Sequence, residues 1–520
     1  MPVVPPFHHS PDHSSSSHAN PTSFPHKWAT NQPPAQDSPK LTFNCRPSPF
    51  LRIILSIVDP KPKYRTTYSS STRPFVPMSE PLLLNFNLLV ESPADPQALL
   101  NDGFRGDGIR ITRRHLLTLD SVCLISAHLR VKGEEHQSAY EQAMARIDTT
   151  FAGEGIAVRS RPASPGGRMI ALVMAPRIGG QALKETWAAL DREGYGITGH
   201  RWLSQRDEVQ ALEFQIEGAP VEPAELTQRL RPWAEAQGID FIVVPEGRER
   251  RRKKFLVIDM DSTLIRQECV DELAAYVGKR DEISAITARA MAGELDFETS
   301  LRERVRALKG LTVADIDKVY EERITLQPGA ERMVAALRGA GIATCLVSGG
   351  FTLIADRIRD RLGLNDSVAC TLELDETGTL TGEIKGPVID ASIKRKAVQA
   401  VADQVGADAR SEGIAVGDGA NDLLMLQAVD AGIGFHPKPL LIEQAPYTIA
   451  RAPLDALLYV LGYSDEEIDH LISAPIPTPS PRRPRRRRPG RGRGAEGEAS
   501  ANDGAASEAA SQPAATSEAS

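Results

Sequence analysis

Cysteine is scarce in this chain of 520 residues, and its scarcity excludes two kinds of stabilisation. None of the five cysteines forms a C-x-x-C pair, so neither a disulfide framework nor a zinc site is indicated. The five are Cys45, Cys123, Cys269, Cys345 and Cys370. We therefore expect reduced thiols and a cytoplasmic location.

Long apolar runs and an excess of positive charge are also missing. No run reaches the roughly 18 apolar residues that a membrane span needs, and the stretch from Phe50 to Val58 is interrupted by Arg52. Lysine and arginine total 61 against 68 acidic residues, so the formal charge is −7. Such a balance creates no global field that would attract nucleic acid. We expect a small-molecule partner, no membrane and no specific nucleic acid.

Both ends of the chain differ in composition from the middle. Residues 1–78 are rich in serine, proline and histidine and have little hydrophobic periodicity, so we expect disorder. A non-native extension is the alternative, because Met78 directly precedes the first strand-like stretch, Leu82 to Val90. Residues 473–520 hold an arginine-rich run and then an Ala, Ser and Glu-rich tail, which predicts a second disordered segment.

The region 79–250 mixes strand and helix patterns. From Met169 to Val244 the order strand, helix, strand, strand, helix, strand predicts the ferredoxin-like α+β motif. This order resembles the ACT-type regulatory domains of amino-acid biosynthesis enzymes. The resemblance implies an amino-acid effector, and pairing of two chains into a homodimer is an open alternative to a monomer. The preceding stretch, with a strand at Val122 to Leu129 and a helix at Ser138 to Phe151, leaves open a degenerate second copy.

Residues 251–472 alternate apolar strands with helices, which predicts an α/β fold with a doubly wound parallel sheet. The first strand, Phe255 to Ile258, is followed at once by Asp259 and Asp261. Two carboxylates after a buried strand are costly unless a cation or a proton satisfies them. A solvated turn is the ordinary alternative for a lone D-x-D pattern, and the later motifs decide against it.

A second strand ends in Ser348, Gly349 and Gly350, at the start of a helix. The hydroxyl and the backbone N–H groups there can cradle a phosphate. Lys394 lies near the start of a later helix and can place a positive charge near that cradle. By itself, the Ser-Gly-Gly motif would most simply be a turn, and a lone lysine on a helix would be solvated.

The last motif follows the strand Gly413 to Val416. It reads Gly-Asp-Gly-Ala-Asn-Asp and supplies Asp418, Asn421 and Asp422. Acidic residues thus follow two buried strands, and open α/β sheets bind ligands at the carboxyl ends of their strands.

Taken in order, the motifs resemble the haloacid dehalogenase-like phosphatases, and most closely the phosphoserine phosphatases. The matching segments are DMDSTLI, VSGGF and VGDGAND, within roughly 215 residues that begin at Phe255. The resemblance implies hydrolysis of O-phosphoserine in the last step of serine biosynthesis. The alternatives are a related phosphatase or phosphotransferase for another small phosphomonoester, and an amino-acid-sensing binding module.

The resemblance also implies roles for the acidic residues. Asp259 would be the nucleophile and Asp261 the proton donor. A Mg²⁺ cofactor would bind the Asp259 carboxylate, the Asp261 main-chain carbonyl and the Asp418 carboxylate. Asp422 would either support these ligands without touching the metal or be a weaker metal ligand itself.

Substrate contacts are implied in the same way. The phosphate side would be bound by Ser348, Gly349, Lys394 and Asn421. Glu268 would face the substrate ammonium and Arg304 its carboxylate; a surface salt bridge is the ordinary reading of such a pair. We expect a helical cap at about 270–326 and a hairpin from Thr371 to Gly386 that helps to close the site.

Overall fold

The computed structural model describes residues 82–91, 109–131, 138, 141–142, 145, 157–162 and 167–474. The predictions for residues 1–78, for the tail from 475 onward and for most of the helix Ser138 to Phe151 lie outside these ranges. None of the helices in the described ranges combines the length and the apolar character needed to cross a bilayer.

The strand and helix order predicted for Met169 to Val244 is confirmed. In chain order the elements are β5 (Arg168–Ala175), α3 (Gly180–Arg192), β6 (Gly196–Gln205), β7 (Gln210–Glu217), α4 (Pro223–Gln237) and β8 (Asp240–Pro245). The strands form one antiparallel sheet in the order β6-β7-β5-β8. This is the ferredoxin-like arrangement.

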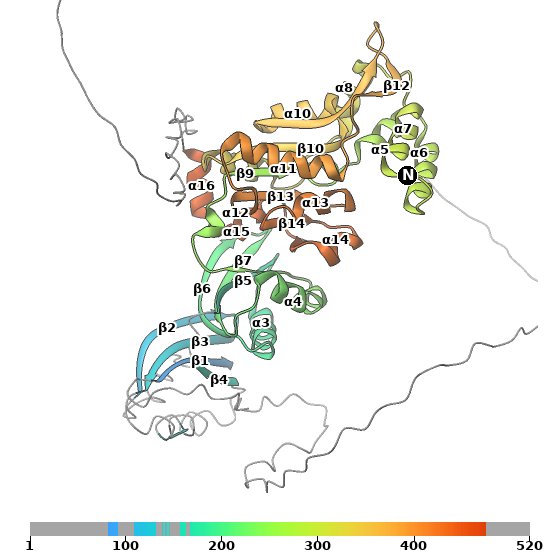
Figure 1. Cartoon of the computed structure of the whole chain (residues 1–520). Helices are drawn as coiled ribbons and strands as arrows, with labels where there is room; N and C mark the ends of the chain where they lie inside the picture. Colours follow the sequence, from blue (N-terminus) through green and yellow to red (C-terminus); the bar gives the residue numbers. More distant parts are fainter. Residues whose placement is uncertain are drawn as a thin grey trace, which may run out of the picture. The chain divides into compact units, whose positions relative to one another are not determined.

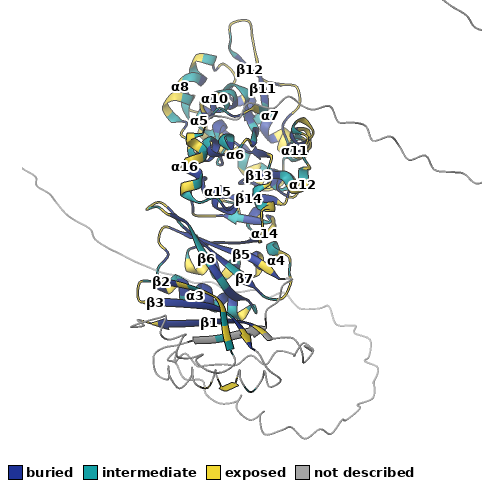
Figure 2. Ribbon diagram, turned by 90° about the vertical axis from the view of Figure 1, so that its left-hand side faces the viewer, coloured by how far each residue is buried: buried dark blue, intermediate teal, exposed yellow. Residues whose placement is uncertain are grey.

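Strand β5 is buried on both faces because its alternate residues belong to two different cores. Ala171 and Val173 pack with the apolar residues of α3 and α4. Leu172 and Met174 join the large core that contains the buried residues of the following α/β region. The sheet therefore lies between the two cores and packs against both. Figure 2 shows its central strands as buried.

A second antiparallel sheet precedes it in the chain. Its strands are β1 (Leu82–Glu91), β2 (Ile109–Leu119), β3 (Val122–Val131) and β4 (Ala157–Pro162), in the order β2-β3-β1-β4. Counted within each sheet, this order is the same as that of the ferredoxin-like sheet, and the predicted strand at Val122 to Leu129 lies within β3.

The α/β region is built on one sheet of seven strands. In chain order the strands are β9 (Phe255–Ile258), β10 (Ala343–Phe351), β11 (Asp366–Leu374), β12 (Leu380–Lys385), β13 (Gly413–Gly417), β14 (Ala431–Phe435) and β15 (Tyr447–Ile449). The sheet order is β12-β11-β10-β9-β13-β14-β15, parallel throughout except for β12. The predicted doubly wound fold is confirmed, with β9 between β10 and β13 (Figure 1).

Helices follow most of these strands. They are α9 (Ala330–Gly339), α10 (Thr352–Leu362), α11 (Ala391–Val405), α12 (Ala409–Glu412), α13 (Leu423–Leu426), α14 (Pro439–Gln444), α15 (Ala456–Val460) and α16 (Asp465–Ser473), with short 3₁₀ turns η2 (Glu249–Arg251) and η3 (Ala420–Asp422). Strand β10 runs through the Ser-Gly-Gly motif to Phe351, because Phe351 resumes pairing with Cys370 after an irregular stretch.

The predicted cap consists of four helices between β9 and α9. They are α5 (Cys269–Tyr276), α6 (Arg280–Met291), α7 (Phe297–Ala307) and α8 (Val313–Arg323). Helix α8 begins at a capping box in which the Thr312 hydroxyl accepts the Asp315 N–H, and the Asp315 carboxylate accepts the Thr312 N–H. Helices α6 and α7 are in contact, and Ile283 on α6 and Leu301 and Val305 on α7 are buried.

The predicted hairpin is formed by β11 and β12, and it is attached to the cap. The Gly310 N–H donates to Leu380 O (3.0 Å), and the Leu380 N–H donates to Leu311 O (2.8 Å). Figure 1 shows β12 beside α7. The hairpin thus fixes the end of α7 to the main sheet.

One buried carboxylate joins the ferredoxin-like sheet to the α/β region. Asp240, at the start of β8, accepts backbone N–H groups from Ala450 (2.8 Å), Arg451 (3.1 Å) and Ala452 (2.8 Å), just beyond β15. Burial raises the pKa of Asp240, and the three hydrogen bonds oppose that rise. This contact fixes the turn after β15.

Replacing Asp240 by alanine should destabilise the chain, because the N–H groups of Ala450, Arg451 and the buried Ala452 lose their acceptor. We expect Asp240→Ala to lower the free energy of unfolding by about 2–4 kcal/mol, measured by urea denaturation. Asp207→Ala, at an exposed position of the same region, should change it by less than about 0.5 kcal/mol. Equal stabilities of the two variants would contradict this role.

Candidate active site

Two aspartates stand at the carboxyl end of β9, in the middle of the sheet. All residues of β9 are buried, as expected for a parallel strand covered on both faces. The Asp259 N–H donates to Val416 O (3.0 Å), and the Met260 N–H donates to Asp259 Oδ1 (2.8 Å). Asp259 is therefore held beside the end of β13, where the last motif begins.

Lys394 reaches Asp259 from helix α11. Its Nζ lies 2.8 Å from Asp259 Oδ1 and 2.7 Å from Asp422 Oδ1, and its side chain is fully buried. Asp390 begins the helix one turn earlier by accepting the Ile393 N–H (2.8 Å). Burial lowers the pKa of Lys394, but the two carboxylates outweigh burial and raise it. The lysine is a buried cation that contacts the predicted nucleophile directly.

Asp422 holds this lysine and the loop after β13 at the same time. One carboxylate oxygen accepts from Lys394, and the other accepts the N–H groups of Asp418 (3.2 Å) and Gly419 (3.1 Å). A Cβ at Gly417 would lie 2.3 Å from Asp422 Cγ, so only glycine allows this approach. Asp422 is thus the anchor of the loop that carries Asp418.

Three carboxylates form a cluster that fits a hard divalent cation. One oxygen each from Asp259, Asp418 and Asp422 lies within 4.8 Å of the others. Buried like charges are unfavourable without a cation, and an all-oxygen donor set suits Mg²⁺. Burial and Asp422 raise the pKa of Asp259, while Lys394 opposes them. The Asp261 carboxylate is not part of this cluster.

Asp261 occupies a different environment from Asp259. Its Oδ1 accepts the Cys269 N–H (3.1 Å) at the start of the cap. Burial, followed by the nearby Glu268 charge, raises the pKa of Asp261 to about 7. A carboxyl group with such a pKa can hold a proton near neutral pH and can also release it. The two aspartates therefore have different partners: Asp259 contacts the buried Lys394, and Asp261 contacts the start of the cap.

The Ser348-Gly349-Gly350 segment lies beside Asp261. The Gly350 N–H donates to Ser348 Oγ (2.8 Å), and a Cβ at Gly350 would lie 2.8 Å from Asp261 Oδ2. A Cβ at Gly349 would lie 3.1 Å from Phe297 Cζ. Phe297, the first residue of α7, was not predicted as a site residue; it brings the cap over the glycine segment.

Glu268 and Arg304, predicted as substrate contacts, both lie at the cap. Glu268 precedes α5, and its Oε1 accepts from Ser262 Oγ (3.0 Å). Burial lowers the pKa of the Arg304 guanidinium, and the charges of Asp271 and Glu268 partly offset burial. No carboxylate in the described part of the chain forms an ion pair with Arg304, so a planar anion would satisfy it.

Lys438 is a site residue that the sequence reasoning missed. It follows β14 and precedes α14, and its Nζ lies 3.1 Å from Glu268 Oε1 and 3.0 Å from Asp418 Oδ2. Burial lowers the pKa of Lys438, but Glu268 and Asp418 outweigh burial and raise it. The signal that could have revealed it is its place just after a buried parallel strand.

Asn421 lies on η3, where a Cβ at Gly419 would approach its amide oxygen to 2.6 Å. Its side chain makes no hydrogen bond to another predicted site residue within the described ranges. The structure thus places Asn421 on the loop that carries Asp418 and Asp422.

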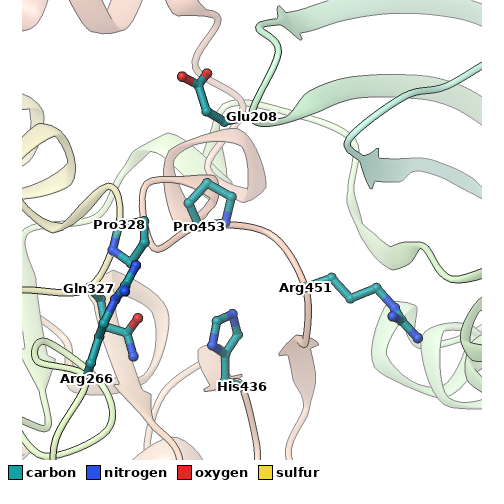
Figure 3. Close-up of a pocket in the computed structure, with 7 residues that line it drawn as sticks. All are labelled: Glu208, Arg266, Gln327, Pro328, His436, Arg451 and Pro453. Carbon is teal, nitrogen blue, oxygen red and sulfur yellow. The ribbon is translucent and has the colours of Figure 1, made fainter. Parts of the chain in front are cut away.

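A cavity of about 450 Å³ opens elsewhere on the structure. It is lined by Glu208, Arg266, Gln327, Pro328, His436, Arg451 and Pro453. Figure 3 shows Glu208 and Arg451 directed away from the His436 ring, so the charged groups do not converge. The lining residues include none of the predicted site residues, and the strand-end cluster remains the candidate active site.

The fold and the site define a hydrolase of the haloacid dehalogenase-like class, whose family model matches residues 253–430. A haloacid dehalogenase family hydrolase from Salmonella enterica serovar Typhi has a similar structure. Its TM-score is 0.50 at 27% identity, over 56% of this chain and 99% of that one.

Relatives that are similar in sequence indicate a narrower class of hydrolase. A phosphoserine phosphatase from Archaeoglobus fulgidus is 42% identical over 49% of this chain and 73% of its own length. One from a Polaromonas species is 45% identical over 39% of this chain and 88% of its own length. One from Streptomyces coelicolor is 41% identical, with 62% of its length matched. The chain belongs to the phosphoserine phosphatase family of these hydrolases.

Removal of the buried lysine should expose how strongly the cluster depends on it. Lys394→Met leaves Asp259 and Asp422 without a buried cation, so we expect the free energy of unfolding to fall by about 3–5 kcal/mol in metal-free buffer. Urea denaturation measures this loss. Lys396→Met, at an exposed position of the same helix, should change it by less than about 0.5 kcal/mol.

A double-mutant cycle tests the cause of that loss. The combination of Lys394→Met and Asp422→Asn should cost less than the sum of the single changes, by about 1–3 kcal/mol, because it also removes one unpaired charge. Additive losses would show that packing, rather than charge, makes Lys394 necessary.

Proposed function

We propose that this chain hydrolyses O-phosphoserine to serine and phosphate. The observation that carries the proposal is the pairing of unlike aspartates: Asp259 contacts a buried lysine, and Asp261, beside the cap, has its pKa raised to about 7. The relatives named above are phosphoserine phosphatases, which supports the same substrate.

In the first half-reaction, Asp259 attacks the phosphorus atom. A P–O bond to the Asp259 carboxylate forms while the bond to the serine oxygen breaks, which gives an aspartyl phosphate. Asp261 gives its proton to the departing serine oxygen. The Ser348 and Gly349 segment and Lys394 lie where they can stabilise the negative charge on the phosphoryl oxygens.

In the second half-reaction, Asp261 acts as a base. Its carboxylate takes a proton from water, whose oxygen attacks the phosphorus and releases phosphate from Asp259. Asp261 is then protonated again and ready for the next substrate. A group with a pKa near neutrality suits both steps.

A Mg²⁺ ion fits the donor set as the cofactor, held by the carboxylates of Asp259 and Asp418 and the main-chain carbonyl of Asp261. When bound, it supplies positive charge that neutralises the phosphate and fixes its orientation. Asp422 is already engaged by Lys394 and by two N–H groups, so it supports the loop rather than serving as a principal ligand.

Arg304 and Glu268 would recognise the serine part of the substrate. The guanidinium can grip the carboxylate with two parallel hydrogen bonds, which lysine cannot do. Glu268 would face the ammonium group. The cap that carries Arg304 also keeps water from the aspartyl phosphate until the leaving group has departed.

The ferredoxin-like region would be an ACT-like regulatory unit that binds an amino-acid effector. The repeated strand order of the two sheets supports a second copy of this unit. A homodimer formed through these sheets is a further part of this proposal. The described cysteines are buried and unpaired, which supports action in the cytoplasm, in the last step of serine biosynthesis.

The covalent mechanism is tested by phosphate release from O-phosphoserine. The parent chain should release phosphate with Mg²⁺ and not with EDTA. Asp259→Asn should abolish both turnover and the acid-stable mass increase of a trapped phosphoenzyme, whereas Asp261→Asn should slow turnover by roughly 10²–10⁴-fold.

Other substrates serve as the control for this assay. A faster reaction with another small phosphomonoester, or transfer of phosphate to an added alcohol, would favour the related phosphatase or phosphotransferase. Full activity of Asp259→Asn would overturn the mechanism. Amino-acid binding without any phosphate release would favour the sensing module.

Arg304 should determine substrate preference. In the parent, kcat/KM for phosphoserine should exceed that for ethyl phosphate by orders of magnitude, because ethyl phosphate offers no carboxylate to the Arg304 guanidinium. Arg304→Ala should erase most of this preference. The measurement is the ratio of the two kcat/KM values.

Arg302→Ala is the matched control, on the same helix. Arg302 pairs with Glu298 at the exposed surface (2.8 Å), so its loss should leave the ratio unchanged. If the ratio is equally high in the parent and in Arg304→Ala, Arg304 does not select the substrate.

A further inference from the structure

Lys438 lies between two groups that the proposed reaction assigns to different cations. Its Nζ is 3.0 Å from Asp418 Oδ2, a proposed magnesium ligand, and 3.1 Å from Glu268 Oε1, the proposed partner of the substrate ammonium. The lysine thus stands on the boundary between the metal site and the substrate site.

The main chain fixes this position. The Lys438 N–H donates to Asp418 O (2.8 Å), so the backbone at Lys438 is tied to the loop that carries the metal ligand. Its side chain is about half exposed (56%), whereas that of Lys394 is fully buried. The ammonium of Lys438 can therefore leave into solvent, and the ammonium of Lys394 cannot.

We propose that Lys438 is a positioning residue that acts as an exchangeable counter-ion and weakens the binding of Mg²⁺ to the substrate-free site. A cation that reaches Asp418 must either displace this ammonium or stand close to it, and both outcomes oppose binding. The inference rests on the proposed magnesium site.

The substrate changes this balance. The phosphate of O-phosphoserine adds negative charge beside Asp259, and its own ammonium can take the place of Lys438 at Glu268. Displacement of Lys438 from the carboxylates then costs less than in the empty site. The lysine therefore makes the metal bind more weakly before the substrate arrives than after it.

Calorimetric titration of the full, substrate-free chain with Mg²⁺ tests the proposal. Lys438→Met keeps the length of the side chain and removes its charge, so the dissociation constant for Mg²⁺ should fall by about three- to tenfold. Lys438→Arg keeps the charge and should stay within about twofold of the parent. Lys396→Met, which removes an exposed charge outside the site, should also match the parent.

An unchanged or higher dissociation constant in Lys438→Met would overturn the proposal, and so would a fall of equal size in Lys438→Arg. Asp418→Asn should abolish the heat of binding; heat that persists there would overturn the proposal together with the metal site. If the parent hydrolyses O-phosphoserine with Mg²⁺ while Lys438→Met binds the ion as the parent does, only the role of Lys438 fails.

Discussion

The concentration of carboxylates at one edge of a buried sheet is the constraint on which the rest of the site depends. Asp259, Asp418 and Asp422 bring their oxygens within 4.8 Å of one another, and all three residues are buried. Such a cluster persists only if cations lie among the charges. Lys394 supplies one from the core side, at 2.8 Å from Asp259 and 2.7 Å from Asp422. The buried lysine therefore stabilises the fold as well as contacting the proposed nucleophile.

The sheet explains why these groups meet. Strand β9 pairs with β10 on one side and with β13 on the other, all parallel, so their carboxyl ends meet at one edge. Glycines then allow close approach where side chains would collide, as at Gly417 beside Asp422 and at Gly350 beside Asp261. The α/β framework sets the distances, and the motif residues supply the charge.

The sequence predicted what depends on local pattern. The bounds of β9 and the start of α10 just after the glycines agree with the structure, because a short apolar run and the glycines define them locally. The acidic motifs also fall at strand ends as expected. Lys438 and Phe297 were missed because their roles arise from contacts across the chain: with Glu268, 170 residues away, and with the glycine segment of β10. Such contacts leave no periodic or compositional trace; for Lys438, only its place just after a buried strand pointed to the site.

The site divides into two halves with different charge balance, and in the proposed mechanism one half carries the chemistry and the other the selectivity. On the sheet side, Lys394 already pairs with Asp259 and Asp422, so the proposed nucleophile is held in place before any substrate binds. On the cap side, Arg304 is largely buried and has no ion-pair partner among the described residues, although the Glu268 and Asp271 charges lie near it. A ligand therefore gains most by placing an anionic group beside Arg304. The cap, rather than the sheet, is therefore where relatives that share this chemistry can differ in substrate, because a change there leaves the nucleophile and its lysine undisturbed.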